Sequence, residues 1–276
     1  MPEERNPGGL LRGGEFYSPV EARLRTADVL LSELRQPRSR AVPRHQHELA
    51  YVTVMLRGDY LEGDRGKLEE LPPFNAVFNP SGVEHATVIG PAGASFFTIE
   101  LRHEPLGQWG VRLPQRTLLD RGAGSLLWPG LRLYSDFKRQ TADALALESH
   151  VLELLGAIAG FSSLEKSVPR WFRRVKERLH EEFRDHLAMR DLAEEAGVHP
   201  VHLARVFRRI ERSTPGDYLQ RLRVRAACPL LRQRDHPLAA IAVECGFADQ
   251  SHFTRVFGKF TATTPAKFRR MVCGLD

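Results

Sequence analysis

Three histidines have the residue type and spacing that best suit the binding of a metal ion or small ligand. His45 and His47 are two positions apart, so on a β-strand both imidazoles face the same side. His85 follows 38 residues after His47. Three imidazoles can hold zinc or a similar divalent ion, with water completing the shell. The alternative is that these residues line a ligand pocket or occupy polar positions at its mouth.

A second group of polar side chains lies within residues 238–270. Two short amphipathic runs flank Gly246-Phe247 there, which is the pattern of a helix-turn-helix whose second helix enters the DNA major groove. On the second run, the apolar residues leave one face free. That face carries Gln250, Ser251, Thr254 and Arg255. Such side chains can read base edges and contact phosphates.

An internal repeat predicts a second copy of this unit. Residues 191–197 match residues 240–246 at an offset of 49, and residues 202–207 match residues 252–257 at an offset of 50. The outward residues of the first recognition helix include Val201, Ala204 and Arg205. Arg205 is the main predicted base reader of this helix, because Val201 can at most contact a thymine methyl group.

The chain's basic residues are concentrated in the same half. A length of 276 residues predicts about two domains. Residues 169–276 contain 21 Lys and Arg against 13 Asp and Glu, whereas the preceding residues contain 19 against 21. This asymmetry predicts a polyanionic partner, such as double-stranded DNA, for the C-terminal part only.

The composition also bears on location. No apolar run approaches the roughly 20 residues of a membrane span, and the N-terminal residues lack the apolar core of a signal peptide. The three cysteines have no paired spacing, which suits a reducing compartment. We therefore expect a cytoplasmic protein without a membrane partner.

The elements that must position these residues form an α+β multidomain chain. Residues 27–101 alternate short apolar runs with turn residues, which predicts an all-β sandwich or barrel. A helix is predicted from about Thr141, a candidate N-cap, to Ala159; its apolar stripe packs on its own domain or serves dimerisation. The predicted domains are residues 1–124, with a loose arm at 1–20, a helical linker at 125–167 and an all-α domain at 168–276.

The histidine segments resemble the two motifs of the cupin barrel. The first is HxH with a later glycine, here Gly58, and the second is PxGxxH, here residues 80–85. In metal-binding cupins a glutamate four or five residues past HxH completes the site. Tyr51 and Val52 stand at those places, and Glu48 faces the opposite side of a regular strand. The resemblance therefore implies a cupin-like domain whose usual fourth metal ligand is missing.

Residues 168–271 resemble the DNA-binding domain of the AraC/XylS family of bacterial transcription regulators, which has two helix-turn-helix units joined by a helix. The residues that match the signature of the second unit are Ile241-Ala242, Gly246-Phe247, Asp249, Ser251, Phe253, Arg255, Phe257, Thr264-Pro265 and Arg269. The family's DNA-contacting places fall on Val201, Ala204, Arg205, Gln250, Ser251, Thr254 and Arg255, within helices at about 200–210 and 249–260.

The resemblance implies a sequence-specific transcription regulator. Its implied partners are double-stranded DNA, a small-molecule effector, RNA polymerase and a second copy of the chain. Two alternatives stay open, namely a metal-dependent cupin enzyme with a basic accessory domain and a constitutive DNA-binding protein whose barrel only dimerises. An enzyme requires a filled metal site with an acid or base nearby; without the cupin glutamate we expect no catalysis.

The sequence departs from the family pattern at three positions. The family glycine two residues before Thr-Pro is Arg212 in the first unit and Ala262 in the second, which predicts another conformation for that turn. Pro229 lies inside the expected linker helix at 217–233. An interior proline removes a hydrogen bond and predicts a kink.

Overall fold

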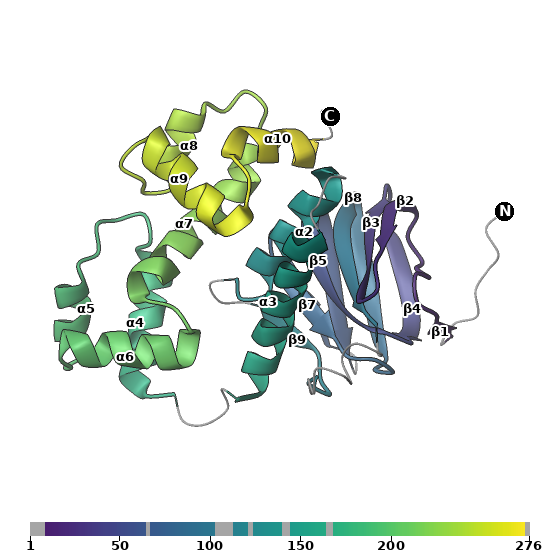
Figure 1. Cartoon of the computed structure of the whole chain (residues 1–276), viewed down its shortest axis with the longest axis horizontal. Helices are drawn as coiled ribbons and strands as arrows, with labels where there is room; N and C mark the ends of the chain where they lie inside the picture. The colour runs from purple at the N-terminus through teal and green to yellow at the C-terminus, as the bar shows by residue number, and fades with distance from the viewer. Residues whose placement is uncertain are drawn as a thin grey trace. The chain divides into compact units, whose positions relative to one another are not determined.

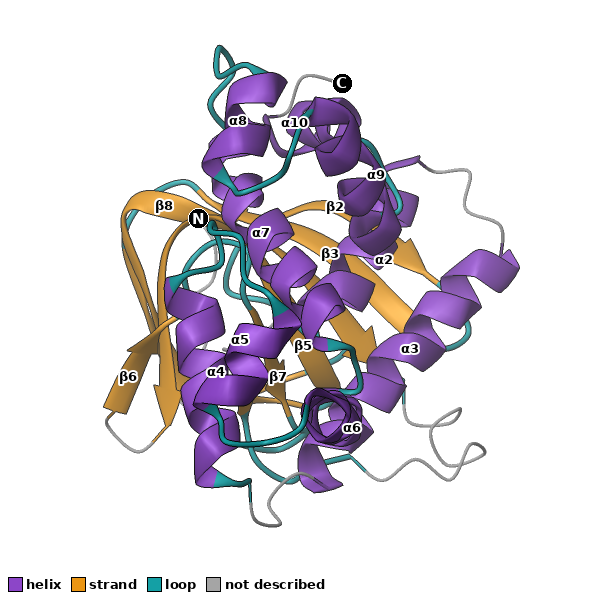
Figure 2. Cartoon of the chain, turned by 90° about the vertical axis from the view of Figure 1, so that its left-hand side faces the viewer, coloured by secondary structure: helices purple, strands orange, loops and turns teal. Residues whose placement is uncertain are grey.

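The computed structural model describes residues 9–64, 67–102, 113–120, 124–139, 144–163 and 168–273. The chain forms two compact units, Met1–Phe161 and Ser162–Asp276. The described strands all lie in the first unit, and the second consists of helices and loops (Figures 1 and 2). The α+β multidomain class is thereby confirmed. The first unit includes a pair of helices up to Phe161, within the stretch predicted as a linker. The predicted N-cap Thr141 lies outside the described residues.

The first unit contains one nine-stranded sheet. Its strands are β1 (Leu10–Leu11), β2 (Val20–Arg25), β3 (Val29–Gln36), β4 (Arg40–His47), β5 (Ala50–Asp64), β6 (Lys67–Glu70), β7 (Ala76–Asn79), β8 (His85–Leu101) and β9 (Leu118–Asp120). Pairing runs in the order β1-β4-β8-β5-β7-β9. The short strands β1 and β9 end this path without pairing to each other, so the described strands form an open mixed sheet and not a closed barrel, the barrel being one of the two architectures that the sequence predicted.

Two long bent strands give the sheet its curvature. The β5–β8 register shifts between Met55 and Arg57 and again between Gly58 and Tyr60, as in β-bulges. Gly58 has φ +92°, and a Cβ added there would lie 1.9 Å from the carbonyl oxygen of Gly93. Only glycine permits this close approach of two backbones. The bend lets the second half of β5, after Gly58, pair with the first half of β8.

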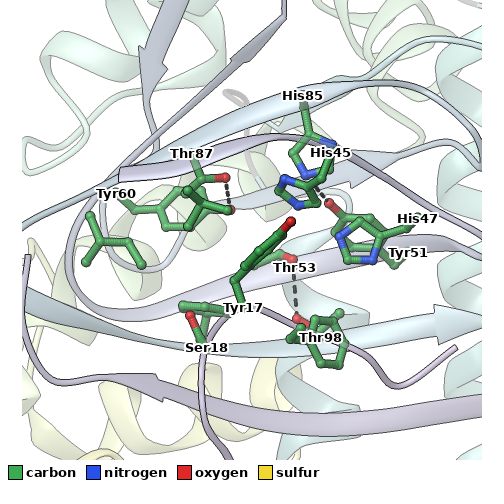
Figure 3. Close-up of a pocket in the computed structure, with 14 residues that line it drawn as sticks. Tyr17, Ser18, His45, His47, Tyr51, Thr53, Tyr60, His85, Thr87 and Thr98 are labelled. Carbon is green, nitrogen blue, oxygen red and sulfur yellow. Dashed lines mark hydrogen bonds between the residues drawn. The ribbon is translucent and has the colours of Figure 1, made fainter. Parts of the chain in front are cut away.

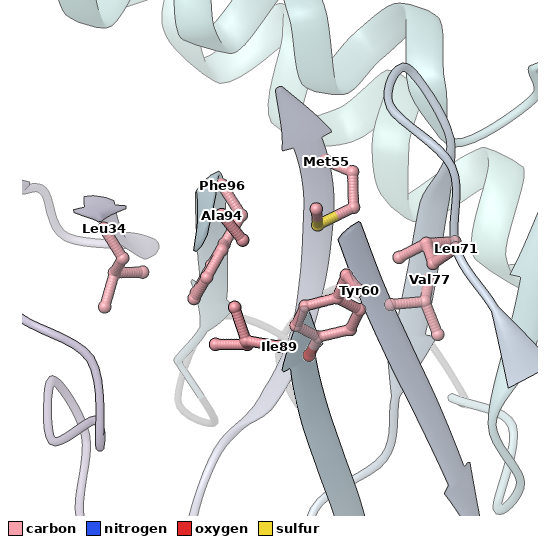
Figure 4. Close-up of a cluster of buried hydrophobic side chains, with 8 residues drawn as sticks. All are labelled: Leu34, Met55, Tyr60, Leu71, Val77, Ile89, Ala94 and Phe96. Carbon is pink, nitrogen blue, oxygen red and sulfur yellow. The ribbon is translucent and has the colours of Figure 1, made fainter. Parts of the chain in front are cut away.

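The first unit contains a cluster of buried hydrophobic side chains. Side chains from the sheet and from the loop before β7 pack together there (Figure 4). They are Leu34, Met55, Tyr60, Leu71, Val77, Ile89, Ala94 and Phe96. Ala94 and Phe96 are two positions apart on β8 and so share one face, whereas Met55 and Tyr60 of β5 lie on either side of its register shifts.

Helices α2 (Leu127–Arg139) and α3 (Ala144–Ser163) complete the first unit. A Cβ added to Gly130 of α2 would lie 2.6 Å from a methyl group of Val54, so this helix packs closely on β5. The α3 stripe Leu147, Val151, Leu154, Leu155 and Ile158 is buried, whereas Ala144 is exposed. The five larger side chains of the predicted stripe are therefore buried, and packing of the stripe on its own domain stays a prediction.

The second unit contains seven described helices. They are α4 (Arg170–Glu181), α5 (Met189–Glu195), α6 (Pro200–Glu211), α7 (Pro215–Leu231), α8 (Leu238–Glu244), α9 (Gln250–Thr261) and α10 (Pro265–Cys273). Aromatic rings fill both halves. Phe207 lies 4.7 Å from Phe172 and 5.7 Å from Tyr218 between ring centroids. Phe257 lies 5.5 Å from Phe253 and 5.2 Å from Phe268.

Helix α7 joins the two halves of the second unit and contains Pro229. The helix ends at Leu231, two residues after the proline and two before the predicted end at Gln233. Pro229 therefore lies in the last turn of α7. Only two residues of the helix follow the proline, which cannot donate a backbone hydrogen bond. The predicted kink stays a prediction. None of the described helices is both long and apolar enough to span a membrane.

Candidate functional site

The three histidines meet inside the sheet of the first unit (Figure 3). His45 and His47 lie on β4, and His45 is in register with His85 on β8. All three are buried, and one ring nitrogen from each lies within 4.8 Å of the others. The prediction that both imidazoles of HxH face the same side is confirmed.

Backbone carbonyls orient two of these rings. His45 Nδ1 lies 2.8 Å from the Pro43 oxygen, and His85 Nδ1 lies 3.4 Å from the Val83 oxygen. A neutral imidazole that donates from Nδ1 leaves its Nε2 lone pair as an acceptor. Burial, with the neighbouring His85, lowers the pKa of His45 to about 4 and that of His47 to about 2. Both rings are therefore neutral near pH 7.

A buried carboxylate completes the cluster. Glu62, on the second half of β5, places Oε1 3.9 Å from His85 Nε2. Asn79 donates one hydrogen bond to Glu62 and another, of 3.1 Å, to the Tyr51 hydroxyl. Burial raises the pKa of Glu62 to about 7, against the hydrogen bond from Asn79. Sequence reasoning missed Glu62 because it is 15 residues past His47; its signal was the period-two pair Tyr60 and Glu62 after a strand-bending glycine.

Tyr51 and Glu48 have different surroundings. The Tyr51 hydroxyl lies 2.9 Å from His85 Nε2, within the cluster. Burial, with the charge of Glu62, raises the pKa of Tyr51 well above its ordinary value. Glu48 is exposed and accepts from the Gly13 amide, as expected for the opposite face of the strand.

The cavity beside the histidines is small. Its volume is about 40 Å³, and residues from β4, β5 and β8 line it together with Phe16, Tyr17 and Ser18. Tyr17 and Phe16 contact His45 and His47, with ring centroids 4.9 and 5.8 Å apart. Part of the predicted loose arm is therefore packed against the site.

The second candidate site is the outer surface of α6 and α9. In each recognition helix the predicted apolar face is buried, through Leu203, Val206 and Phe207 in α6 and through Phe253, Val256 and Phe257 in α9. The predicted contact residues Val201, Arg205, Gln250, Ser251 and Arg255 are exposed, and Ala204 and Thr254 are half-buried. Val201 is 60% exposed, which a packing role would not explain.

Side-chain caps fix the starts of the recognition helices. His199 Nδ1 accepts from the Val201 amide at 3.3 Å, and Asp249 accepts from the His252 amide at 2.7 Å. The Thr254 hydroxyl donates to the Gln250 carbonyl at 2.8 Å, so it is left as an acceptor toward an external group. The ring of His202, which is exposed, lies 5.7 Å from that of Trp171, and the ring of the half-buried His252 lies 5.5 Å from that of Phe247 between centroids.

The comparisons with known proteins concern mostly the second unit. A helix-turn-helix domain family matches residues 192–271. Regulatory protein SoxS of Escherichia coli (strain K12) is 33% identical over 78 residues, which cover 28% of this chain and 73% of SoxS. The chain belongs to the AraC family of transcription regulators.

Two further AraC-family matches differ in extent. The bifunctional transcriptional activator/DNA repair enzyme AdaA of Bacillus subtilis is 34% identical over 37% of this chain, and the match spans 48% of AdaA. The chain thus covers about half the length of that relative. The HTH-type transcriptional activator RhaR of Mannheimia succiniciproducens is 24% identical over 82% of this chain and 87% of its own length.

Two AraC-family signature residues have structural roles in this chain. Gly246 has φ +81°, and a Cβ there would lie 2.4 Å from the Arg184 oxygen, so the turn between α8 and α9 requires glycine. Arg269 donates to the carbonyls of Leu231, Arg234 and His236, which lie at and after the end of α7. Arg269 therefore stabilises the fold rather than contacting DNA.

Arg212 and Ala262, which replace the glycine of the AraC-family pattern, both adopt the left-handed backbone conformation. Arg212 ends α6 with φ 50°, and Ala262 ends α9 with φ 54°. The prediction of another conformation for these turns is wrong. The Thr-Pro pair that starts the next helix follows after a single residue. A left-handed residue at the helix end turns the chain within this short connection.

Proposed function

We propose that this AraC-family protein is a sequence-specific, effector-responsive transcription regulator. Helices α6 and α9 read the major groove of double-stranded DNA. The observation that carries the proposal is the segregation on both helices: one face is buried in the unit, and the other presents the polar and basic side chains. The relatives that match most of the chain are also named as regulators, which favours regulation over catalysis.

The two helices differ in what they can read. On α9, Arg255 suits a guanine edge and Gln250 an adenine edge, while Ser251 accepts or donates. On α6, Arg205 is the only strong donor of the three predicted contacts, and Val201 contributes apolar contact with a thymine methyl group. We therefore assign most of the base discrimination to α9.

The decisive test is Arg255→Ala. Arg255 is exposed and the structure gives it no fold-stabilising hydrogen bond among the described residues, so the variant should fold normally. We expect it to weaken binding to a selected duplex site by about 1–3 kcal/mol and to relax preference at one base pair. Titration of fluorescent duplexes measures this.

The matched control is Arg173→Ala, on the exposed surface of α4. A phosphate partner at this place affects all sequences alike and lowers the salt dependence of binding. If Arg255→Ala costs less than roughly 0.3 kcal/mol on the selected site, Arg255 is not a reader.

The first unit is the sensor in this proposal. Its interior carries three histidines and a buried glutamate, whereas a barrel that only dimerises needs an apolar interior. The protein would act in the cytoplasm as a homodimer, with RNA polymerase as its further partner. An effector shifts the regulator only if it binds one of its two states more tightly than the other.

A further inference from the structure

The chemistry of the histidine pocket indicates the class of effector. Its lining residues among the described part of the chain include three imidazoles and no Lys or Arg. An anionic effector would find no cationic partner here. Glu62 instead brings a carboxylate beside His85, and its side chain is only 2% exposed.

Two polar atoms at this site have no hydrogen-bond partner among the described residues. They are Nδ1 of His47 and Oε2 of Glu62, both buried. A buried polar atom without a partner costs about 1–3 kcal/mol. A bound cation would satisfy the carboxylate and would bring the rings into a fixed arrangement.

The histidine geometry is that of a metal-ready site. Ligating histidines in proteins usually donate their other ring nitrogen to a carbonyl or carboxylate, as His45 and His85 do here toward Pro43 and Val83. In a tetrahedral zinc site with bonds of about 2.0–2.1 Å, neighbouring ligand atoms are roughly 3.4 Å apart. The three histidine nitrogens lie within 4.8 Å of one another, and Glu62 Oε1 lies 3.9 Å from His85 Nε2. Small side-chain rotations therefore suffice to close the site.

The cavity volume argues against a larger occupant. A cavity needs about 10–15 Å³ to hold one water molecule, so about 40 Å³ accommodates an ion with a few waters. Pockets for organic ligands of drug size occupy roughly 300–1,000 Å³. Of the two classes, only an ion fits without expansion of the sheet.

We propose that His45, His47, His85 and Glu62 bind one divalent transition-metal ion, such as Zn²⁺, and that this ion is the effector. This inference rests on the proposed regulatory function and identifies the class of effector to which the regulator responds. Nitrogen and carboxylate ligands of this kind suit zinc and its neighbours in the first transition row. Glu62 supplies the carboxylate from a place that the cupin pattern does not use, while Tyr51 stands at the pattern's glutamate position.

The metal site can be tested without DNA. The full-length protein is stripped with a chelator and titrated with Co²⁺, whose visible spectrum reports ligand number and type, and with Zn²⁺ against a competing chelator. We expect one ion per chain. Glu62→Gln should weaken binding by at least about 10–100-fold, the range for losing a group that only supports a ligand, and should change the Co²⁺ spectrum. Glu48→Gln, an exposed glutamate one residue from His47, is the matched control.

A second variant separates ligation from packing. The Tyr51 hydroxyl now bonds to His85 Nε2, and a metal must displace that bond. Tyr51→Phe should therefore bind Co²⁺ at least as tightly as the unaltered protein. The absence of a stoichiometric ion, or equal affinity and identical spectra for Glu62→Gln and Glu48→Gln, overturns the site.

The effector role has its own readout. The stripped and Zn²⁺-loaded proteins are compared on a duplex selected from a random pool. We expect their affinities to differ at least tenfold, and the difference to disappear in Glu62→Gln at the same Zn²⁺ concentration. Metal binding with equal DNA affinities overturns the effector role. Metal binding with no sequence-specific DNA affinity in either state overturns the proposed regulator instead, while the metal site stands.

Discussion

Arg212 and Ala262 show how single residues can carry backbone strain within a repeated fold. Both residues have a positive φ at the end of a recognition helix. An L-residue in the left-handed region costs roughly 1–2 kcal/mol, and glycine does not pay this penalty. We therefore predict that Ala262→Gly raises the free energy of unfolding by about 1 kcal/mol, less the entropy that glycine loses on folding. Urea denaturation measures the change.

A matched substitution tests the sign of that effect. Ala266 lies exposed within α10, where the same change to glycine removes helix propensity and should destabilise by about 1 kcal/mol. If Ala262→Gly raises and Ala266→Gly lowers the free energy of unfolding, the result supports backbone strain at Ala262. A loss of stability in both would show that the turn at Ala262 is relaxed with its present side chain.

Glu100 gives a pH prediction outside the histidine site. Burial raises the pKa of its carboxyl to about 7, against two hydrogen bonds from the Gly14 amide. The folded protein thus holds this proton more tightly than the unfolded chain, so stability falls as pH rises from about 4.5 to 7. Glu100→Gln should be more stable than the unaltered protein at pH 8, on the order of 1–2 kcal/mol, and the gain should shrink toward pH 5. Thermal melts across this range measure it, and an equal difference at all pH values contradicts it.

At the scale of elements, arginine clamps join the ends of helices in the second unit. Arg269 of α10 bonds three carbonyls at and after the end of α7, and Arg223 of α7 bonds the carbonyls of Phe183 and Asp185 after α4. A hydrogen bond that involves a charged group contributes about 1.5–3 kcal/mol to stability. Arg269→Ala should therefore lower the free energy of unfolding by about 2–3 kcal/mol.

Its exposed neighbour provides the comparison. Arg270→Ala should leave stability within about 0.5 kcal/mol, as expected for surface changes. Below its unfolding temperature, Arg269→Ala should keep sequence-specific DNA affinity, whereas Arg255→Ala loses affinity and keeps stability. A normal melt combined with lost DNA binding in Arg269→Ala would make Arg269 a contact residue instead of a clamp.

The elements also show which parts of the structure the sequence could predict. The two helix-turn-helix units follow from local periodicity and the repeat, which also indicate that each recognition helix has an apolar face, and these faces are buried around Phe207 and Phe257. The His45–His47 pair followed from strand alternation. Glu62 did not, because its approach to His85 depends on the shifted register after Gly58. The choice between a barrel and an open sheet could not be made from the sequence either, because it depends on which distant strands pair.

At the scale of the whole molecule, α3 carries exposed leucines that could join two copies of the chain. Leu145 is 71% and Leu152 47% exposed on this helix, seven residues apart and so on the same face. Two exposed leucines at a heptad spacing, on a helix whose other leucines are buried, suit a helix pair between copies. Leu147, Val151 and Leu154 are buried in the single chain and are unavailable for such contacts.

We therefore predict that Leu145→Glu with Leu152→Glu converts the dimer to a monomer without unfolding the protein, because both positions are exposed in the single chain. Light scattering after size-exclusion chromatography measures the mass, and circular dichroism checks the fold. The control is Leu68→Glu, the same change at a leucine of β6 that is 42% exposed, which should leave the mass unchanged. If the proposed homodimer binds two adjacent half-sites, the monomer should also lose cooperative binding, while each copy keeps its affinity for a single half-site. A dimer that persists in the double variant would place the interface elsewhere on the molecule.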